Sequence, residues 1–427
     1  MHVLMLCALD VWALHGRGGA PSLYRTLRAY GERGHRVTVV APTIGANAQL
    51  PREGLRSAKP SPLPDLPGVT FQRFHLPSLQ ESRLPLPSIA KAVDQKLRFA
   101  ILYPYLASRQ AKRVLEDGHV DLLYGYEVHG LLAAKSLRRH GSDVPIVARY
   151  QGTVLHPHLN SKLALLRASE EVRAMRTQAD LYIMTNDGTR GDEVLAQLNP
   201  SSAGKVRFWR NGLDLDRLRP ADSATRQRLR ADLNVPDDAL VLLTASRLAR
   251  WKRVDRVVAA MPEIIRAIPK AELIVVGDGD ERANLERQAR DLGVWDSVRI
   301  TGSVPQGDVL SYMQAADLFL APADLSNVGN PLMEAMCCGM PIVTVDAGET
   351  SDLIRDGETG RLLPTGRPAA IAQAVIELAR DTGMRCRLAA GAREEATKRF
   401  WTWEERMTAE LEAVEQLVAS DQPARRS

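Results

Sequence analysis

Residues 318–350 read LFLAPADLSNVGNPLMEAMCCGMPIVTVDAGET and combine two apolar runs with glycine and proline residues between them. The apolar run LFLAP predicts a buried strand, and Asn330 and Pro331 predict the start of a helix, as its cap and first-turn residue. Gly339 and Pro341 predict the end of that helix before a second strand, IVTV. A helix between two parallel strands points its free N–H groups beyond the strand ends, where diphosphates can bind. The stretch therefore predicts an anion-binding turn in a parallel α/β sheet.

Glu334 lies one turn into this predicted helix. At that position its carboxylate could accept hydrogen bonds from the vicinal hydroxyls of a ligand. It could equally be a solvated helix residue, and spacing alone leaves both interpretations open.

Strand and helix patterns alternate along the chain, which is typical of parallel sheets covered on both faces. In the first half we expect strands at 2–9, 35–42, 69–74, 120–126, 144–150 and 179–185. In the second half we expect them at 205–212, 239–246, 271–279, 297–304, 317–322 and 340–345. Because 427 residues exceed the usual size of one core, we predict two doubly wound domains, 1–210 and 211–400, followed by 401–427. The charged stretch 214–236 is the predicted linker.

The composition is that of an ordinary globular protein. With 56 Lys and Arg against 51 Asp and Glu and only 5% aromatic residues, it argues against a nucleic-acid partner. The cysteines lack metal-ligand spacing and indicate reduced thiols of a cytoplasmic protein; they are Cys7, Cys337, Cys338 and Cys386. The apolar N-terminus lacks a basic leader and a cleavage site, so we expect a strand there rather than a signal peptide. No apolar run reaches membrane-spanning length.

Residues 91–113, KAVDQKLRFAILYPYLASRQAKR, combine basic ends with an apolar middle. Such a segment could lie on an acidic membrane surface as a peripheral contact. More often it forms a pair of core helices with solvated basic ends, and this second interpretation is the one we favour.

The 318–350 stretch resembles the donor-binding signature of the retaining nucleotide-sugar glycosyltransferases of family 4, which have the GT-B fold. That fold has two Rossmann-like domains facing across a cleft. The residues that match the signature are Gly329, Glu334, Ala335, Gly339 and Pro341. The resemblance implies a donor site that includes Ser326, Gly329, Asn330, Pro331 and Glu334. Ser326 stands where the family usually has a Glu that reaches the sugar hydroxyls, which implies a different sugar contact, to which Asp324 could contribute.

Further segments match the family across nearly the whole chain. Gly18 and Gly19 precede a pattern at 27–40 that resembles the family's first strand–helix–strand unit, in which such glycines let the backbone approach a ligand. Residues 210–220 resemble its interdomain linker, and 401–427 resemble the final helix, which crosses back to the first domain.

Residues 245–261 resemble the family segment that grips the donor diphosphate, a role that Arg247 and Lys252 would inherit. Fixed cations there would stabilise the charge that develops on the departing phosphate without a metal. Arg253 departs from the pattern, because the family has Gly at that place. The loop that contains Gly277 would border the base and ribose.

Two strings imitate metal sites, DLD at 214–216 and GDGD at 277–280. The first falls in the linker pattern, and the second lacks the remaining oxygen ligands of a calcium loop. We therefore expect no catalytic metal and no cofactor, since a nucleoside-diphosphate sugar is a co-substrate. The resemblance implies a UDP-sugar first, with retention at the anomeric carbon and with the leaving phosphate taking the acceptor's proton.

The first domain, expected to hold the acceptor, departs most from the family. Glu127 and His129 follow the strand at 120–126, where relatives place a His, and Gln151 follows the next strand. Glu127 and His129 could orient an acceptor hydroxyl or stabilise the transition state, although a His in such a place is more often structural. Residues 185–195 should line the cleft.

The acceptor is open between a small molecule, a glycan and a lipid-linked hydroxyl. Two other functions remain as alternatives: a nucleotide-sugar epimerase of the same fold, and a donor-binding pseudoenzyme, which the replacements at Ser326 and Gln151 suggest.

Overall fold

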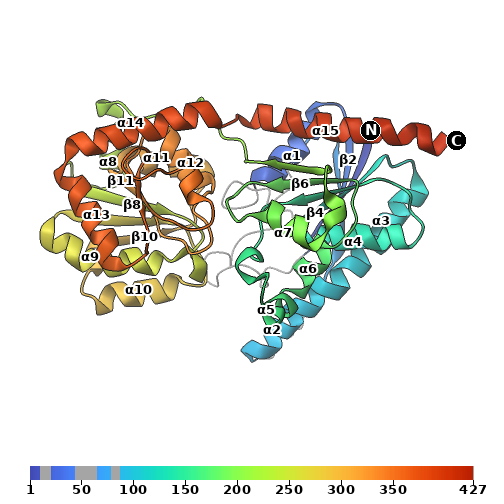
Figure 1. Cartoon of the computed structure of the whole chain (residues 1–427), viewed down its shortest axis with the longest axis horizontal. Coiled ribbons are helices and arrows are strands. Elements are labelled where there is room, and N and C mark those ends of the chain that lie inside the picture. The colour runs from blue at the N-terminus through green and yellow to red at the C-terminus, as the bar shows by residue number, and fades with distance from the viewer. Residues whose placement is uncertain (10–20, 44–64, 78–86, 427) are drawn as a thin grey trace.

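The computed structural model describes residues 1–9, 21–43, 65–77 and 87–426. They form two lobes, each built on a parallel sheet with helices on both of its faces (Figure 1). The prediction of two doubly wound α/β domains with parallel sheets is confirmed.

The first sheet has seven strands in the order β3-β2-β1-β4-β5-β6-β7. Every neighbouring pair is parallel, for example with Val3 opposite Val37 on one side and Leu122 on the other. The strands are β1 His2–Cys7, β2 Arg36–Thr43, β3 Val69–His75, β4 Leu122–Tyr126, β5 Ile146–Tyr150, β6 Leu181–Thr185 and β7 Val206–Trp209. The order reverses between β1 and β4, so the crevice of this sheet opens at their carboxyl ends.

The second sheet has six parallel strands in the order β10-β9-β8-β11-β12-β13, and its order reverses between β8 and β11. The strands are β8 Leu240–Ala245, β9 Ala271–Val276, β10 Val298–Gly302, β11 Leu318–Ala321, β12 Ile342–Val345 and β13 Arg361–Leu363. The predicted strands at 317–322 and 340–345 are neighbours here, with Phe319 opposite Ile342.

Two sequence-based expectations were wrong in this region. The strand expected at 205–212 to open the second half is β7, which pairs with β6 and completes the first sheet. The predicted linker 214–236 contains helix α8, Ser223–Asp232, which Asp222 caps through its side chain. A hydrophobic pattern predicts that a segment is a strand, but it does not predict which strand it pairs with, and this explains the first error.

Helices cover the four sheet faces and build an apolar core on each. In the first lobe they are α1 Pro21–Glu32, α2 Ser88–Leu97, α3 Tyr103–Asp117, α4 Glu127–Arg139, α5 Lys162–Arg167, α6 Ser169–Met175 and α7 Gly191–Leu198, with a π-helical turn at Arg98–Leu102. In the second they are α8, α9 Val254–Ala267, α10 Arg282–Asp291, α11 Gln306–Ala315, α12 Asn330–Cys337, α13 Pro368–Arg380 and α14 Thr382–Arg399.

The last helix, α15 Trp403–Arg426, runs along the first lobe although the chain reaches it from the second (Figure 1). Leu411, Val414 and Val418 belong to the core on one face of the first sheet. Beneath them the buried Glu410 accepts a 2.6 Å hydrogen bond from Tyr124 and pairs with Arg406 at 3.1 Å. Two chain segments thus join the lobes, and they meet where Leu213 bridges Thr402.

Candidate active site

The carboxyl ends of β8 and β11, at the switch point of the second sheet, carry the two donor-side motifs. After β8 the chain passes through Arg247 and a 3-10 turn, Arg250–Lys252, before α9 begins. After β11 it passes through the loop 322–329 and enters α12, with Gly329 as the N-cap and Pro331 in the first turn. The predicted helix start is confirmed to within one residue, but the cap assignment was wrong: Gly329 is the N-cap, and Asn330 is the first residue of the helix. The free amides of α12 therefore lie at the same sheet edge as the cations that follow β8.

Lys252 is half-buried, and its Nζ atom lies 4.1 Å from the centre of the Trp251 ring. Burial lowers the pKa of this amine to about 8, while the carboxylate of Asp187 raises it and the nearby Arg247 lowers it further. The structure thus brings Arg247 and Lys252 close enough to repel each other. A dianionic ligand such as a diphosphate would stabilise the charged form of Lys252 in these surroundings.

Gly277 fixes the backbone that carries Arg247. Its φ is +141°, and a Cβ there would lie 1.9 Å from the carbonyl oxygen of Ser246. The loop is held in place by the Leu248 amide, which donates to the Asp278 carbonyl at 2.9 Å. Only glycine permits this approach. Gly277 therefore has a structural role beside the base-binding role that the sequence suggests.

Glu334 is partly buried in the second turn of α12. The pKa of the nearby Cys337 thiol is raised to about 12, mainly by the burial of the thiol and next by the negative charge of Glu334. Asn330 is tied to the interlobe crossover, because the Asn211 amide donates to its side-chain oxygen at 3.3 Å.

Ser326 is buried where the two lobes touch. Its hydroxyl donates to the backbone carbonyl of Asp187 at 2.6 Å and accepts from the Val328 amide at 3.0 Å. Gly188 follows Asp187 with φ +74°, and a Cβ there would lie 2.4 Å from the Ser326 hydroxyl. Ser326, which the resemblance places in the donor site, thus joins the lobes in this structure.

Asp324, the other expected sugar contact, lies between two arginines. Its carboxylate pairs with Arg253 at 3.0 Å and with Arg256 at 2.6 Å. Arg253 has φ +54°, a left-handed conformation that explains why the related sequences have Gly at this place. Asp255 holds its guanidinium through two 3.0 Å hydrogen bonds.

Replacing Arg253 with Gly should leave stability almost unchanged while altering the sugar preference. Removing the left-handed side chain relieves roughly 1 kcal/mol of backbone strain. Loss of the partly exposed ion pairs costs a similar amount, about 0–1 kcal/mol. Asp324 would keep its ion pair with Arg256 but lose the one with Arg253, which frees part of its carboxylate to contact a ligand. Melting curves and kcat/KM over a panel of nucleotide sugars check this, and a large fall in Tm with an unchanged sugar ranking would contradict it.

Glu127 begins α4 directly after β4, at the edge of the first sheet that faces the second lobe. Its φ is +61°, and its Oε1 atom is buried with no hydrogen-bond partner. Burial raises the pKa of this carboxyl to about 7, which Arg149 and a backbone hydrogen bond from Gln151 oppose and Glu171 and Asp187 reinforce. A strained residue with a carboxyl that titrates near neutrality is well suited to a ligand hydroxyl.

Glu127→Gln should remove a pH dependence of stability. The folded protein holds the Glu127 proton more tightly than the unfolded chain, so this stabilisation is complete below pH about 4.5 and is lost as pH rises through about 7. At 1.36 kcal/mol per pKa unit the loss is at most about 3 kcal/mol. The difference in Tm between wild type and variant should therefore fall with pH. Glu116→Gln, an exposed change in the same lobe, should show no such trend, and a flat difference for Glu127→Gln would contradict the assignment.

His129 lies two residues beyond Glu127, in the first turn of α4, but its side chain contacts other residues. Its Nε2 atom is 2.9 Å from the Glu170 carboxylate, and its ring packs on Phe99 with the ring centres 5.3 Å apart. These contacts fit the structural interpretation of His129 and give it a place in joining α4 to the helices beside it.

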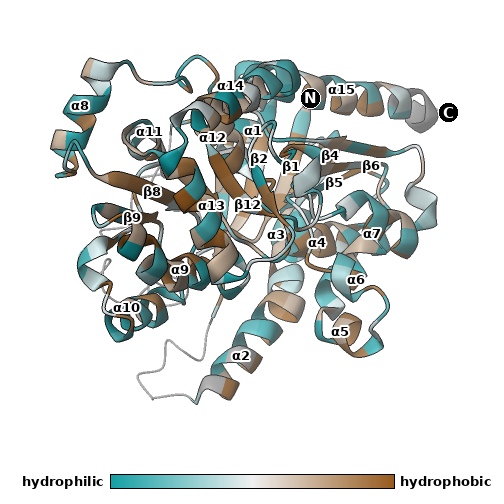
Figure 2. Ribbon diagram, turned by 60° about the vertical axis from the view of Figure 1, so that its left-hand side comes forward, coloured by the Kyte–Doolittle hydropathy of each residue, from teal (hydrophilic) through white to brown (hydrophobic). Residues whose placement is uncertain are grey.

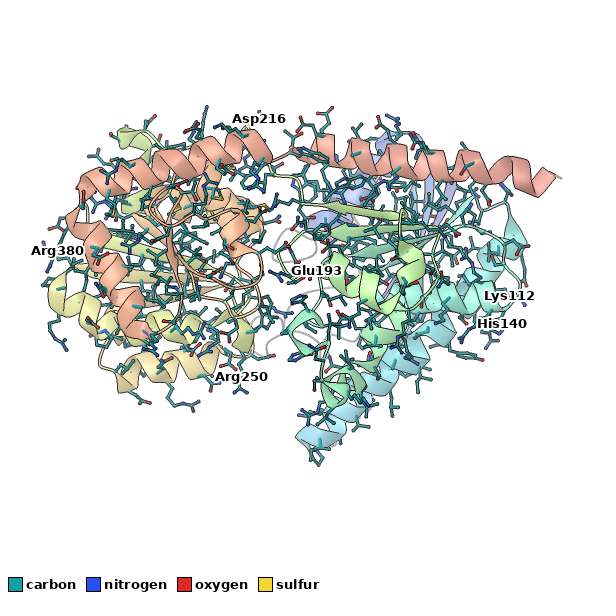
Figure 3. All side chains as sticks on the ribbon, viewed as in Figure 1. Lys112, His140, Glu193, Asp216, Arg250 and Arg380 are labelled. Atoms are coloured by element: carbon teal, nitrogen blue, oxygen red, sulfur yellow. The ribbon has the colours of Figure 1, made fainter. Side chains whose placement is uncertain are left out.

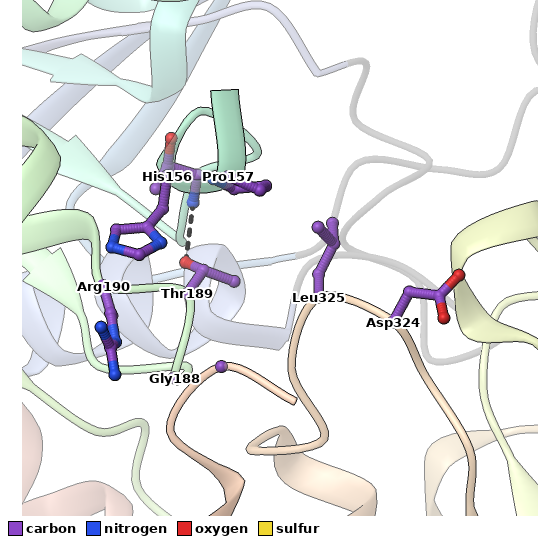
Figure 4. Close-up of a pocket in the computed structure, with 9 residues that line it drawn as sticks. His156, Pro157, Gly188, Thr189, Arg190, Asp324 and Leu325 are labelled. Carbon is purple, nitrogen blue, oxygen red and sulfur yellow. Dashed lines mark hydrogen bonds between the residues drawn. The ribbon is translucent and has the colours of Figure 1, made fainter. Parts of the chain in front are cut away.

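A cavity of about 240 Å³ lies between the lobes (Figure 4). From the first lobe it is lined by loops after β5 and β6, and from the second by the loop after β11 and by Gly348; the lining includes Thr153, His156, Thr189, Arg190 and Leu325. Glu193 lies where the lobes approach each other (Figure 3), and its carboxylate is 3.3 Å from the Nε2 atom of His156. The prediction that residues 185–195 line the cleft is confirmed for Gly188–Arg190.

Sequence reasoning missed Asp187 as an individual site residue. Burial raises the pKa of its carboxyl to about 6, although Thr189 donates two hydrogen bonds to it, and Lys252 is among the groups that lower it. A single Asp in a polar turn does not indicate, from the sequence alone, that a lysine of the other lobe lies near it.

Gly18 and Gly19 lie outside the described residues. The metal-like strings have protein partners: Asp214 accepts from Arg25 at 2.7 Å, and Asp278 accepts from its neighbouring backbone amide at 2.8 Å. In the part of the chain that the structure describes, no group of three or more His, Cys, Asp or Glu side chains could hold a metal ion.

Comparison with known proteins agrees with this geometry. A family model described as Glycosyl transferases group 1 matches residues 225–395, and one described as Glycosyltransferase Family 4 matches residues 16–217. A GDP-mannose-dependent alpha-(1-6)-phosphatidylinositol monomannoside mannosyltransferase of Mycolicibacterium smegmatis is 29% identical over 71% of this chain and 78% of its own. A D-inositol 3-phosphate glycosyltransferase of Acidothermus cellulolyticus is 29% identical over 68% of this chain and 66% of its own.

The fold is also that of solved structures. A crystal structure of HepE from Anabaena in complex with UDP and glucose matches with a TM-score of 0.66 at 20% identity, covering 96% of this chain and 99% of the other. At this identity the likeness shows the fold alone. With two family models that together match most of its length, and with two facing parallel-sheet lobes, this chain belongs to the group 1 and family 4 glycosyltransferases of the GT-B fold.

Proposed function

We propose that this enzyme transfers a sugar from a nucleoside-diphosphate sugar to a hydroxyl acceptor, with retention at the anomeric carbon and without a metal. The observation that carries the proposal is the grouping of Arg247 and Lys252 at the sheet edge where α12 begins. Two cations and the amides of a helix N-terminus form a site for a diphosphate. Glu334, one turn further in, would bind the sugar hydroxyls.

The proposed chemistry needs no protein base. As the bond between the anomeric carbon and the diphosphate breaks, the acceptor oxygen bonds to that carbon on the same face, and its proton passes to the leaving phosphate. Arg247 and Lys252 stabilise the charge that develops on that phosphate. Glu127, on the opposite lobe, would hold the acceptor hydroxyl beside the leaving phosphate.

The donor nucleotide is proposed as UDP first and GDP second. Family analogy favours UDP, while the Mycolicibacterium relative is named for GDP-mannose. The acceptor is proposed as a polyol, free or lipid-linked, because the two relatives are named for phosphatidylinositol monomannoside and D-inositol 3-phosphate. The protein is proposed to act in the cytoplasm, where such donors would be met.

Product analysis tests the proposal. The purified enzyme is incubated with EDTA, one UDP- or GDP-sugar at a time, and inositol phosphate or phosphatidylinositol as acceptor. NMR of the product should show the donor's anomeric configuration. An inverted product, or activity that disappears with EDTA and returns with a divalent cation, would refute the proposed mechanism. Interconversion of the donor sugar without an acceptor would support the epimerase alternative.

A further inference from the structure

An exposed apolar stripe runs along α2 and the helical turns that follow it. Its members recur every four residues, and their exposed fractions lie between 52% and 79%: Ile89, Val93, Leu97, Ile101 and Tyr105. In a straight α-helix this spacing drifts around the axis. The π-helical turn at 98–102 holds more residues per turn, which offsets the drift and keeps the five side chains on one side.

Helix α5 extends the stripe sideways. Leu163 and Leu166 are 59% and 68% exposed, and the Lys96 ammonium donates to the Arg167 carbonyl at 3.2 Å, which joins α5 to α2. Both helices lie at the same outer edge of the first lobe (Figures 1 and 2). Of the eleven large apolar side chains exposed among the described residues, seven belong to this patch, here called the α2–α5 patch. Such a concentration marks an interaction surface.

The charges around the patch are almost all positive. Residues 87–113 contain six Lys and Arg residues and one acid; Asp94 is buried, and so is one of the six cations, Arg98, which leaves five basic side chains that are not buried. Lys162 and Arg167 lie exposed at the two ends of α5. A second copy of the chain would bring two such basic rims together, whereas an anionic surface complements them.

We propose that the α2–α5 patch docks the protein on an anionic lipid bilayer, with the stripe inserted at the level of the headgroups. In the described ranges no helix has the length and apolar character to cross a membrane, and an amphipathic helix that lies in the interface needs neither. The sequence-based preference for a plain pair of core helices is therefore revised: the inner face is core, and the outer face is a docking surface.

The inner face of the same helices packs on the helix that Glu127 begins. Phe99, in the π-helical turn, is buried and packs on His129 in the first turn of α4, the helix that Glu127 begins. The Arg98 guanidinium donates to the Leu76 carbonyl at 3.0 Å and fixes the turn to the body of the lobe. Docking would therefore set the acceptor side of the cleft at a fixed orientation to the lipid surface.

Vesicle sedimentation with the full chain tests the docking surface, without a sugar donor and independently of the proposed chemistry. Phosphatidylcholine vesicles with and without phosphatidylglycerol are compared. Binding should require the anionic lipid and weaken at high salt. Ile89→Ser with Ile101→Ser should lower the partition coefficient by ~10-fold or more. Lys91→Gln with Lys96→Gln should lower it by roughly five-fold for each lysine.

Leu292→Ser, at an exposed apolar residue of the other lobe, is the matched control and should bind as wild type does. Because every substituted side chain is partly or well exposed, circular dichroism and Tm should stay unchanged. Wild-type protein that sediments with neither vesicle would overturn the proposal. So would vesicle-free dimerisation, seen by analytical ultracentrifugation, that the Ile89→Ser and Ile101→Ser changes abolish.

Discussion

Lys252→Ala should lower kcat/KM by about 10²- to 10³-fold, the usual cost of removing one fixed charge-stabilising donor. Folding should be almost unaffected, because burial already lowers the pKa of this amine to about 8 and so penalises its charged form. In the wild type, kcat/KM should also fall as pH rises through about 8, since the neutral amine stabilises the leaving diphosphate less. The variant should lack that fall.

Arg250→Ala is the matched control, because Arg250 lies exposed on the same 3-10 turn (Figure 3). It removes the same charge and should change kcat/KM by less than about threefold. Steady-state kinetics with melting curves on both variants decide the matter. Equal losses of activity in the two, or a loss of Tm in Lys252→Ala that matches its loss of activity, would assign Lys252 to the fold instead.

Glu334→Gln should lower kcat/KM by ~10²-fold with a Tm within a few degrees of wild type. A carboxylate that binds sugar hydroxyls is replaced by an amide of the same shape, so the helix is preserved while a charge-assisted hydrogen bond is lost. The effect should fall on sugar transfer, with the affinity for the free nucleoside diphosphate nearly unchanged, because the helix amides and Lys252 remain.

Glu263→Gln, at an exposed glutamate on α9 of the same lobe, controls for the charge change. Initial rates are measured beside calorimetric titration of the nucleoside diphosphate. Parallel weakening of diphosphate affinity and turnover in Glu334→Gln would contradict a contact with the sugar and would indicate that Glu334 supports the helix N-terminus.

The fold and the donor motifs could be predicted from short stretches of neighbouring residues. The apolar runs at 318–321 and 342–345 and the Asn330-Pro331 pair predicted the right elements, because strand pattern and helix starts are properties of neighbouring residues, although the cap itself is Gly329. Strand β7 was assigned to the wrong half, since its partner β6 is fixed only by tertiary pairing. The three-residue β13 was too short to produce a pattern.

The site could be predicted where a motif is contiguous and not where it is assembled from both lobes. The local sequence does not indicate that the Asp187 carboxylate interacts with Lys252. It also does not indicate that the Ser326 hydroxyl donates a hydrogen bond to the backbone of the opposite lobe. Backbone strain was equally invisible. Of the four non-glycine residues with positive φ in the described ranges, Arg190 lines the interlobe cavity and Arg253 pairs with Asp324, which also lines it.

Ligand-induced thermal stabilisation tests whether Lys252 belongs to a metal-independent site for a nucleoside-diphosphate sugar. The wild type and Lys252→Ala are melted with UDP, GDP and their sugar conjugates, each with and without EDTA. A ligand bound at 100 times its Kd stabilises the fold by about 2.7 kcal/mol, so one nucleotide sugar should raise the wild-type Tm by several degrees, with or without EDTA, and should raise that of the variant far less. A shift that needs a divalent cation, or an equal shift in both proteins, would contradict the account.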